Sequence, residues 1–274
     1  MTASASAARG TALVVVDVQN DFCAGPLAAS RYPGDPGRLA EVVANTARAV
    51  AAARARGVEV VLVRFLGDPE YQGAAWRRRD VARGKPPKCL AGTWGAEFTA
   101  PLQPAPGEAV FTKHASFDAF LAQGPEPYGG VEDAEVPVSA RGLERYLTQR
   151  GISHLAFAGL FADVCVDSTA RTAFQKGFHL TVLSDCTTAL HTSDEQILTF
   201  MRRLYGARVT THDHPSLWAR HPEEDPWTEP PATSAPPPAA PAPMSIPAAV
   251  PAAVPAPENP LPHQAAPAPE NPPR

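Results

Sequence analysis

The chain has 274 residues, a formal net charge of -4 at pH 7 and no concentrated block of basic residues. This balance disfavours nucleic acid or an anionic membrane as the main partner, and no apolar run is long enough to predict a membrane-spanning helix. The first ten residues lack the apolar middle of a secretory signal, and the four cysteines are too widely spaced for a paired metal motif or a dense disulfide framework, so we expect a cytoplasmic protein in a reducing compartment.

Six short runs of β-branched and other apolar residues predict strands. Most of them are apolar on both faces, as strands buried on both sides of a parallel sheet are. In chain order they cover residues 11–17, 58–65, 108–113, 154–159, 179–185 and 207–212.

Helical patterns lie between these runs. Residues 37–57 end in Gly57, and residues 139–151 begin with Ser139, a good N-cap, and end in a glycine. Residues 163–177 and 193–206 repeat this scheme. The alternation predicts an α/β protein, a three-layer αβα sandwich around a mostly parallel sheet of about six strands, with its ligand site beyond the carboxyl ends of the strands.

Composition divides the chain into three parts. We expect residues 1–10 to be a disordered N-terminus and residues 11–220 to form one folded domain. Residues 221–274 are dominated by Pro and Ala and contain PAPENP twice, a composition that predicts a disordered or polyproline-II-like tail. Such a tail is either a solvated appendage or a tether for a partner with a Pro-binding groove.

Two charged residues stand at strand ends. Asp17 follows an apolar run, and Lys113 ends the third predicted strand in the same way. A carboxylate in such surroundings must be paired or solvated in a cleft, because burying it alone is costly. A buried Asp–Lys pair can also be purely structural, so position alone leaves both interpretations open.

Cys165 follows the fourth predicted strand. If Asp163 is the N-cap of the next helix, Cys165 lies in its first turn, where backbone N–H groups, the helix dipole and a nearby lysine stabilise a thiolate. The alternative is a packing cysteine, since free cysteine is among the most buried residue types. A thiolate, a base and a cation at one sheet edge are the parts of a nucleophilic acyl-transfer site.

Three segments, in this order, resemble the isochorismatase-like cysteine hydrolase superfamily: VVVDVQNDF (14–22), TKHASF (112–117) and GLFADVCVDSTARTAF (159–174). CLAGTWGAEF (89–98) and YGARVTTHD (205–213) belong to the same resemblance, which covers residues 11 to about 213. The superfamily includes nicotinamidases, N-carbamoylsarcosine amidases, ureidoacrylate and maleamate amidohydrolases, and streptothricin hydrolases.

The resemblance implies a role for each reactive residue. Asp17 would be the general base, Lys113 would hold the proton path, and Cys165 would attack the amide carbon of a small molecule and carry the acyl group as a thioester. The oxyanion would be held by the backbone N–H groups of Phe161 and Cys165, after a cis peptide between Leu160 and Phe161.

The sequence departs from two branches of the superfamily. Nicotinamidases have an Asp-x-His metal motif after the second strand, but residues 63–80 contain no histidine, so we expect no metal and no cofactor and keep nicotinamidase as a minor alternative. Isochorismatases that cleave a vinyl ether have glycine where Cys165 stands, so the cysteine favours C–N cleavage. A non-catalytic scaffold on the same fold is a further alternative.

Other residues near these motifs have less certain roles. Phe22, Trp94 and Phe161 are candidate pocket walls, with core packing as the alternative. Gln19 and Asp21 are expected to orient their loop.

His114 is expected to be structural, because it should point to the opposite face from Lys113. Cys23, Cys89 and Cys186 are interpreted as packing residues. The run Arg77–Arg79 is interpreted as a solvated face or an anion contact. Residues 121–138 could form a lid or a surface insertion. The superfamily commonly forms oligomers, so we expect a homodimer or homotetramer.

Overall fold

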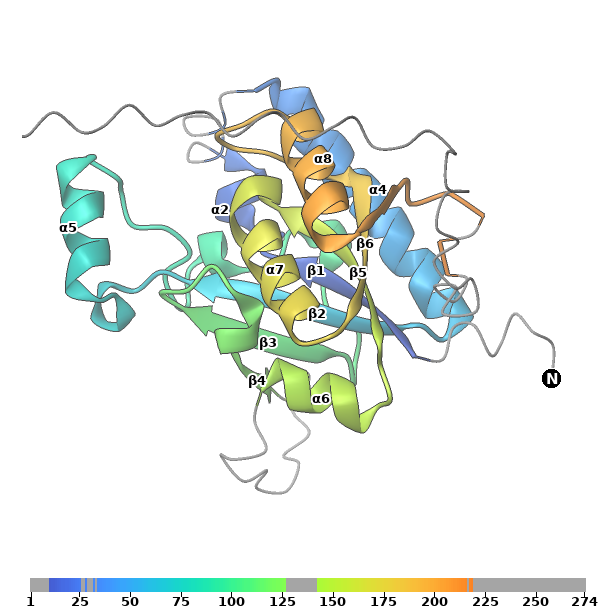
Figure 1. The fold of residues 1–274 in the computed structure, drawn as a ribbon. Helices are drawn as coiled ribbons and strands as arrows, with labels where there is room; N and C mark the ends of the chain where they lie inside the picture. Colours follow the sequence, from blue (N-terminus) through green and yellow to red (C-terminus); the bar gives the residue numbers. More distant parts are fainter. Residues whose placement is uncertain are drawn as a thin grey trace, which may run out of the picture. The chain divides into compact units, whose positions relative to one another are not determined.

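Seven strands form one sheet in the computed structural model, which describes residues 10–25, 28, 32, 34–126, 142–215, 217 and 218. The strand order is β4-β3-β2-β1-β5-β6-β7 (Figure 1). Neighbouring strands are parallel except for β4, which pairs antiparallel with β3. The strands are β1 (Thr11–Val16), β2 (Glu59–Leu66), β3 (Ala109–His114), β4 (Gln123–Glu126), β5 (His154–Leu160), β6 (His179–Thr188) and β7 (Arg208–Thr210).

Helices cover both faces of the sheet (Figure 1). Helix α4 (Pro36–Arg56) packs on one face, and α6 (Leu143–Gln149), α7 (Asp167–Gln175) and α8 (Asp194–Tyr205) pack on the other. The two faces have separate cores because side chains alternate along each strand: Leu13 and Val15 of β1 pack toward α4, whereas Val14 and Val16 pack toward the other helices. The predicted three-layer α/β fold is confirmed.

The helix ends follow the residues that predict them. Gly57 ends α4 in a left-handed conformation, with φ of 66°. Ser193 and Gln196 form a capping box at the start of α8, which Gly206 ends at φ of 63°. The predicted start of the second helix is wrong: α6 begins at Leu143, and Ser139 lies outside the described residues.

Several short elements have no counterpart in the sequence prediction. They are α2 (Asn20–Cys23), α5 (Ala74–Ala82) and the 3-10 helices η1 (Pro69–Tyr71), η2 (Trp94–Ala96), η3 (Ala100–Leu102) and η4 (Ala119–Leu121). Strand β4 adds a seventh strand to the six expected, and it uses the start of the segment 121–138. Residues 127–138 of that segment lie outside the described part of the chain, so its role as a lid stays a prediction.

After β2 the chain makes a long loop away from the sheet, and the two ends of this loop lie next to each other. The Gly67 N–H donates to the Cys89 carbonyl at 3.0 Å, which closes the segment 67–89 at its two ends. A Cβ at Gly67 would lie 2.2 Å from the Lys88 carbonyl oxygen, so this closure requires glycine. We call residues 67–88 the β2 excursion. It carries α5, which stands apart from the sheet in Figure 1.

All described residues belong to one unit of the chain, Met1–Pro226. Residues 1–9 of the expected N-terminal segment and the whole of the expected tail, 221–274, lie outside the described residues. The domain division therefore remains a prediction. None of the helices that the structure describes has the length and apolar character needed to cross a membrane.

Candidate active site

Four strand ends meet at the edge of the sheet where the sequence predicts the site. Val16 of β1 pairs with Gly159 of β5, and Phe65 of β2 pairs with Lys113 of β3. Gly159 has φ of 112°, and a Cβ there would lie 2.0 Å from the Val16 carbonyl oxygen, so only glycine lets β5 approach β1 this closely. This register brings Asp17, Lys113 and the turn that holds Cys165 to the same edge.

Asp17 and Lys113 form a buried ion pair. Lys113 Nζ donates to Asp17 Oδ2 at 2.6 Å, and the exposed fractions of the two side chains are 0% for Lys113 and 1% for Asp17. Lys113 Nζ also donates to the Phe117 carbonyl at 3.2 Å. Asp17 has φ of 53°, a conformation that non-glycine residues rarely adopt and that occurs often at functional sites.

The second carboxylate oxygen of Asp17 is oriented for another donor. Asp17 Oδ1 is buried and has no hydrogen-bond partner among the described residues. Burial raises the pKa of the Asp17 carboxyl above its ordinary value of 3.8, although the charge of Lys113 and contacts with Lys113 and Cys165 oppose that rise. A buried oxygen without a partner is costly in a purely structural pair, so it suits a proton acceptor.

Cys165 lies in a single π-helical turn, η6 (Ala162–Val166), directly before α7. Its side chain lines the same cavity as Asp17, and the residue is 8% exposed. Burial and the negative charge of Asp17 raise the pKa of the Cys165 thiol, whereas Lys113 opposes the rise. This direction opposes the stabilisation expected from the helix start and from Lys113, and it favours a mechanism in which a base takes the thiol proton.

Asp163 does not cap the helix of Cys165, contrary to the sequence prediction. No side chain caps η6, and the Asp163 carboxylate accepts from the N–H groups of Leu190, His191 and Thr192 at 2.6 to 3.0 Å. Asp163 therefore fixes the loop after β6 against the cysteine turn, a contact between distant segments that helix capping rules do not predict.

The backbone before Cys165 has one feature that the family resemblance implies. The peptide bond between Leu160 and Phe161 is cis. The N–H groups of Val164 and Val166 close the turn by donating to the Phe161 carbonyl at 3.0 and 3.2 Å. The N–H groups of Phe161 and Cys165, the expected oxyanion donors, take no part in those two bonds.

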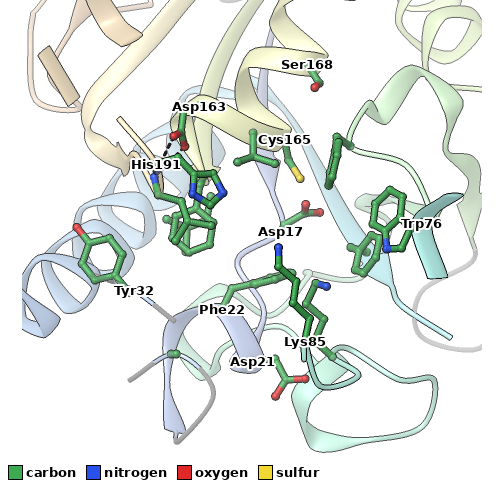
Figure 2. A pocket seen from close by; sticks show the side chains of 18 of the residues that line it. Asp17, Asp21, Phe22, Tyr32, Trp76, Lys85, Asp163, Cys165, Ser168 and His191 are labelled. Carbon is green, nitrogen blue, oxygen red and sulfur yellow. Dashed lines mark hydrogen bonds between the residues drawn. The ribbon is translucent and has the colours of Figure 1, made fainter. Parts of the chain in front are cut away.

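A cavity of about 360 Å³ opens above these groups, and aromatic side chains form much of its wall. Figure 2 shows Cys165 and Asp17 facing it, with Tyr32 and Trp76 on opposite sides. Of the predicted walls, Phe22 and Phe161 line the cavity and contact each other edge to face, with ring centroids 6.2 Å apart. Trp94 does not line it: this residue is 56% exposed on η2.

Several aromatic wall residues were not found from the sequence. They are Tyr32, Phe65, Trp76 and Phe117. Each comes from a different segment, and an isolated aromatic residue carries no pattern that separates a pocket wall from core packing.

Four cationic residues of the β2 excursion also line the cavity: Arg79, Arg83, Lys85 and Lys88. Arg79 is the member of the run Arg77–Arg79 that reaches this wall. It pairs with Asp80 at 2.7 Å and lies over the Trp76 ring at 4.6 Å. The high proportion of Arg and Lys over residues 77–88 is visible in the sequence. Only the fold shows that four of these cations line the cavity.

Gln19 and Asp21 orient their surroundings, as expected. The Gln19 side chain donates to the carbonyls of Phe65 and Ala96 and accepts from the Phe65 N–H, each at 2.8 Å. Asp21 Oδ2 accepts from the Cys89 N–H at 2.6 Å.

His114 and two of the cysteines lie outside the cavity wall. The His114 ring packs on Tyr71, with centroids 4.2 Å apart. Cys89 is buried and Cys23 is half-buried, both without a disulfide partner.

The three-layer fold, with cysteine, aspartate and lysine at strand ends beside a small aromatic cavity, defines the class of isochorismatase-like α/β proteins. The model of the isochorismatase domain family matches residues 11–214, and the chain belongs to this family.

Named relatives agree with this assignment. The chain is 33% identical over 192 residues to ureidoacrylate amidohydrolase RutB of Pantoea ananatis, an alignment covering 65% of this chain and 68% of that protein. It is 32% identical over 179 residues to the nicotinamidase/pyrazinamidase of Mycobacterium tuberculosis, covering 64% and 85%. The structure of N-carbamoylsarcosine amidase from Thermoplasma acidophilum matches with a TM-score of 0.57 and 25% identity, covering 74% of this chain and 97% of that one. The predicted superfamily is confirmed, and these relatives agree with the predicted class of enzyme, a hydrolase of C–N bonds other than peptide bonds.

Proposed function

We propose that this chain is a cysteine-dependent amidohydrolase that cleaves a C–N bond of a small anionic molecule through a thioester on Cys165. One observation carries the proposal: the buried Asp17–Lys113 pair lies beside the Cys165 thiol, and Asp17 and Cys165 line the same cavity. The positions of these groups supply a nucleophile, a base and a fixed cation, which is the set that acyl transfer needs.

The first half of the reaction makes the thioester. Asp17 takes the proton of the Cys165 thiol while Sγ attacks the carbonyl carbon, which forms the C–S bond. Asp17 then gives that proton to the leaving nitrogen as the C–N bond breaks. Lys113, hydrogen-bonded to Asp17 at 2.6 Å, keeps the carboxylate oriented and offsets the negative charge that appears on sulfur.

The second half returns the enzyme to its starting state. A water molecule gives a proton to Asp17 and attacks the thioester carbon, the C–S bond breaks, and the proton returns to the sulfur. The backbone N–H groups of Phe161 and Cys165 would hold the oxyanion in both halves, and a donor of this kind contributes about 2.7–4 kcal/mol to lowering the barrier.

The cations of the β2 excursion favour an anionic substrate. Arg83, Lys85 and Lys88 add positive charge to a cavity that aromatic rings largely enclose, and Figure 2 shows Lys85 on the wall across from Cys165. Among the lining carboxylates, Asp17 pairs with Lys113, Asp21 accepts from one backbone N–H, and Asp163 accepts from three. A substrate carboxylate opposite the reacting carbonyl would face the positive charge of this wall.

Two relatives are named for such compounds, a ureidoacrylate and an N-carbamoyl amino acid. We therefore propose ureido and N-carbamoyl acids as the substrate class. The nicotinamidase relative makes a neutral aromatic amide the second candidate, which the aromatic wall could accommodate.

A screen of matched compounds tests the proposal. Purified enzyme is incubated with N-carbamoyl amino acids and ureido acids, their neutral esters, nicotinamide and small lactams, and release of ammonia or amine is measured. We expect the acids to react fastest, and intact-mass spectrometry of quenched reactions to show an acyl adduct on Cys165. Faster turnover of nicotinamide would favour the second candidate.

The remaining alternatives predict different results in the same screen. An isochorismate-like vinyl ether added to the screen, if it is cleaved by Cys165→Ala as well as by the unchanged enzyme, would support ether hydrolysis. No turnover of any compound, together with a thiol that iodoacetamide does not modify above background, would support a non-catalytic scaffold and contradict the proposal.

Other expectations rest on the sequence alone, and we keep them as proposals. They are a homodimer or homotetramer, a cytoplasmic location, a folded domain over residues 11–220, and a Pro-binding partner for the tail. Light scattering on the eluting protein, with and without residues 221–274, tests the first and asks whether the tail affects it.

A further inference from the structure

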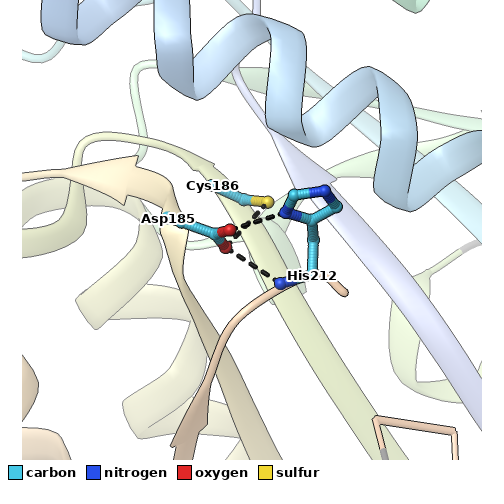
Figure 3. A group of neighbouring side chains, drawn as sticks. All are labelled: Asp185, Cys186 and His212. Atoms are coloured by element: carbon cyan, nitrogen blue, oxygen red, sulfur yellow. Dashed lines mark hydrogen bonds and ion pairs between the residues drawn. The ribbon is translucent and has the colours of Figure 1, made fainter. Parts of the chain in front are cut away.

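A second cysteine lies with an aspartate and a histidine at the carboxyl edge of the sheet. Asp185 and Cys186 belong to β6, and His212 follows β7 by two residues. Their potential ligand atoms, a carboxylate oxygen, Sγ and a ring nitrogen, all lie within 4.8 Å of one another (Figure 3). Within the described part of the chain, this is the one group of three such side chains.

A shift in the pairing register between β5 and β6 brings the side chains of Asp185 and Cys186 together. Phe157 of β5 pairs with Val182, but Gly159 pairs with Thr187, so five steps along β6 match two along β5. In a regular strand, consecutive side chains such as those of Asp185 and Cys186 point to opposite faces. A bulge turns them from that alternation, and Figure 3 shows both beside the imidazole of His212.

The three side chains already contact one another. His212 Nδ1 lies 2.5 Å from Asp185 Oδ2, and the His212 backbone N–H donates to Asp185 Oδ1 at 3.0 Å. The Cys186 thiol lies 3.5 Å from Asp185 Oδ1.

Helix α4 holds the bulge in place. Asn45 donates to the Asp185 carbonyl at 3.0 Å, and Thr46 donates to the Cys186 carbonyl at 3.3 Å. Arg38 donates to the carbonyls of Ser184 and Thr187 at 3.0 and 3.2 Å. Backbone that is fixed on both sides of the two ligands reduces the ordering cost of binding an ion.

We propose that Asp185, Cys186 and His212 bind one divalent zinc ion. Thiolate, imidazole and carboxylate are the ligand types of zinc in proteins, and three protein ligands leave a fourth position for water. Cys186 is fully buried, but the side chains of Asp185 and His212 are 20% and 15% exposed, so the ion and its water can reach the site from solvent.

The adjustment that binding requires is small. Zinc–ligand bonds of about 2.0–2.3 Å in a tetrahedron place neighbouring ligand atoms about 3.3–3.7 Å apart. The carboxylate and imidazole must therefore separate by about 1 Å, within the reach of side-chain rotation. Binding releases the thiol proton and any proton on Nδ1, and the two negative ligands balance the charge of the ion.

The zinc site is separate from the proposed active site. Cys186 packs in the core on the α4 face of the sheet, whereas Cys165 packs in the core on the opposite face. The inference therefore does not depend on the amidohydrolase proposal. Its expected effect is structural, because the ion would tie β6 to the segment that follows β7.

Cobalt(II) tests the site, since it replaces zinc and reports its ligands optically. The reduced full-length protein is treated with a chelator, exchanged into metal-free buffer and titrated with Co²⁺. We expect one equivalent to produce the near-ultraviolet band of thiolate-to-cobalt charge transfer and the intense visible bands of tetrahedral cobalt. Zinc should then displace the cobalt, abolish both signals and raise the melting temperature.

Variants assign the signal to these residues. Cys186→Ser should lose the charge-transfer band, and His212→Asn should weaken Co²⁺ binding by more than about tenfold. Cys165→Ser, Cys23→Ser and His214→Asn are matched controls that should keep the signal. His212 is partly exposed, so its variant should fold even if Cys186→Ser does not, which circular dichroism checks in chelator.

Three outcomes would overturn the proposal. They are no charge-transfer band in the wild-type protein, a band of unchanged strength in His212→Asn, and a band that disappears in Cys165→Ser instead. The first outcome would leave Asp185 and His212 as a hydrogen-bonded pair only.

Discussion

The floor and the rim of the cavity are built in opposite ways. The reactive residues Asp17, Lys113 and Cys165, which we call the floor, come from three distant parts of the chain, and all are buried. Asp17 and Cys165 line the cavity, and Lys113 is paired with Asp17. The cations at the rim are Arg79, Arg83, Lys85 and Lys88. They come from one continuous segment, the β2 excursion, and are half-buried or exposed. The sheet thus fixes the reacting groups, while a separate loop supplies the charge that meets the substrate.

This difference determines how strongly each region should respond to change. A charge on the floor has lost its water and depends on its partner, so removing one member leaves the other without compensation. A charge on the rim is screened by water and ions, so removing it should weaken binding only modestly.

The largest expected effect is at the nucleophile. Cys165→Ala should lower kcat by about four orders of magnitude or more and leave the fold intact, because alanine cannot form the thioester. Initial rates of amine release and far-ultraviolet circular dichroism measure the two effects. Cys23→Ala, which removes a thiol outside the cavity wall, is the control and should keep its turnover. Appreciable turnover by Cys165→Ala would contradict a mechanism in which Cys165 is the nucleophile.

Breaking the ion pair should cost both stability and rate. Lys113→Met should reduce the free energy of unfolding by about 3–5 kcal/mol, because Asp17 would remain buried without its cation. Adding Asp17→Asn should recover part of that stability but none of the activity. Urea denaturation of both single variants and the double variant measures the coupling. If the loss of unfolding free energy in the double variant equals the sum of the losses in the two single variants, the two side chains do not act as a pair.

The pH dependence should report Asp17. The base must be ionised to take the thiol proton, and its pKa is raised above 3.8, so kcat/KM should fall as the pH drops through a value higher than that of an ordinary carboxyl. Below that pKa the rate should fall about tenfold per pH unit. A profile of kcat/KM against pH, with folding checked at each pH, tests this. An acid limb centred at or below 3.8 would contradict the raised pKa.

The smallest effect should be at the rim. Arg83→Gln and Lys85→Met should each raise KM for an acidic substrate by about three- to tenfold, with kcat nearly unchanged, because they remove charge distant from the reacting bond. The neutral ester of the same substrate should show no such change. Arg78→Gln is the control, since Arg78 belongs to the same β2 excursion, on α5, but does not line the cavity. Equal effects on acid and ester would show that the rim does not recognise charge.

The sequence predicted the floor because its residues follow apolar strand patterns and lie in recognisable motifs. Asp17 and Lys113 stand where such runs end, and glycines mark the helix ends. The upward shift of the Cys165 pKa could not be predicted from the sequence, because it depends on burial and on the charge of Asp17, which appear only when the strands are assembled.

The rim and the zinc site were missed for another physical reason. Helix α5 buries none of its residues, so it has no apolar periodicity to reveal it. The neighbours Asp185 and Cys186 should point to opposite faces of a regular strand, and no signal in the sequence predicts the bulge that brings both to His212. Trp94 was a candidate wall residue, with core packing as the alternative, but a single aromatic residue does not specify which side of a loop it occupies.

The closure between Gly67 and Cys89 has a consequence for how this enzyme could change over evolution or by engineering. Since the chain departs and rejoins at one hydrogen bond, a replacement segment of different length and charge could be inserted there without shifting any strand. A new substrate specificity could then arise from replacement of the β2 excursion alone, while Asp17, Lys113 and Cys165 keep their positions.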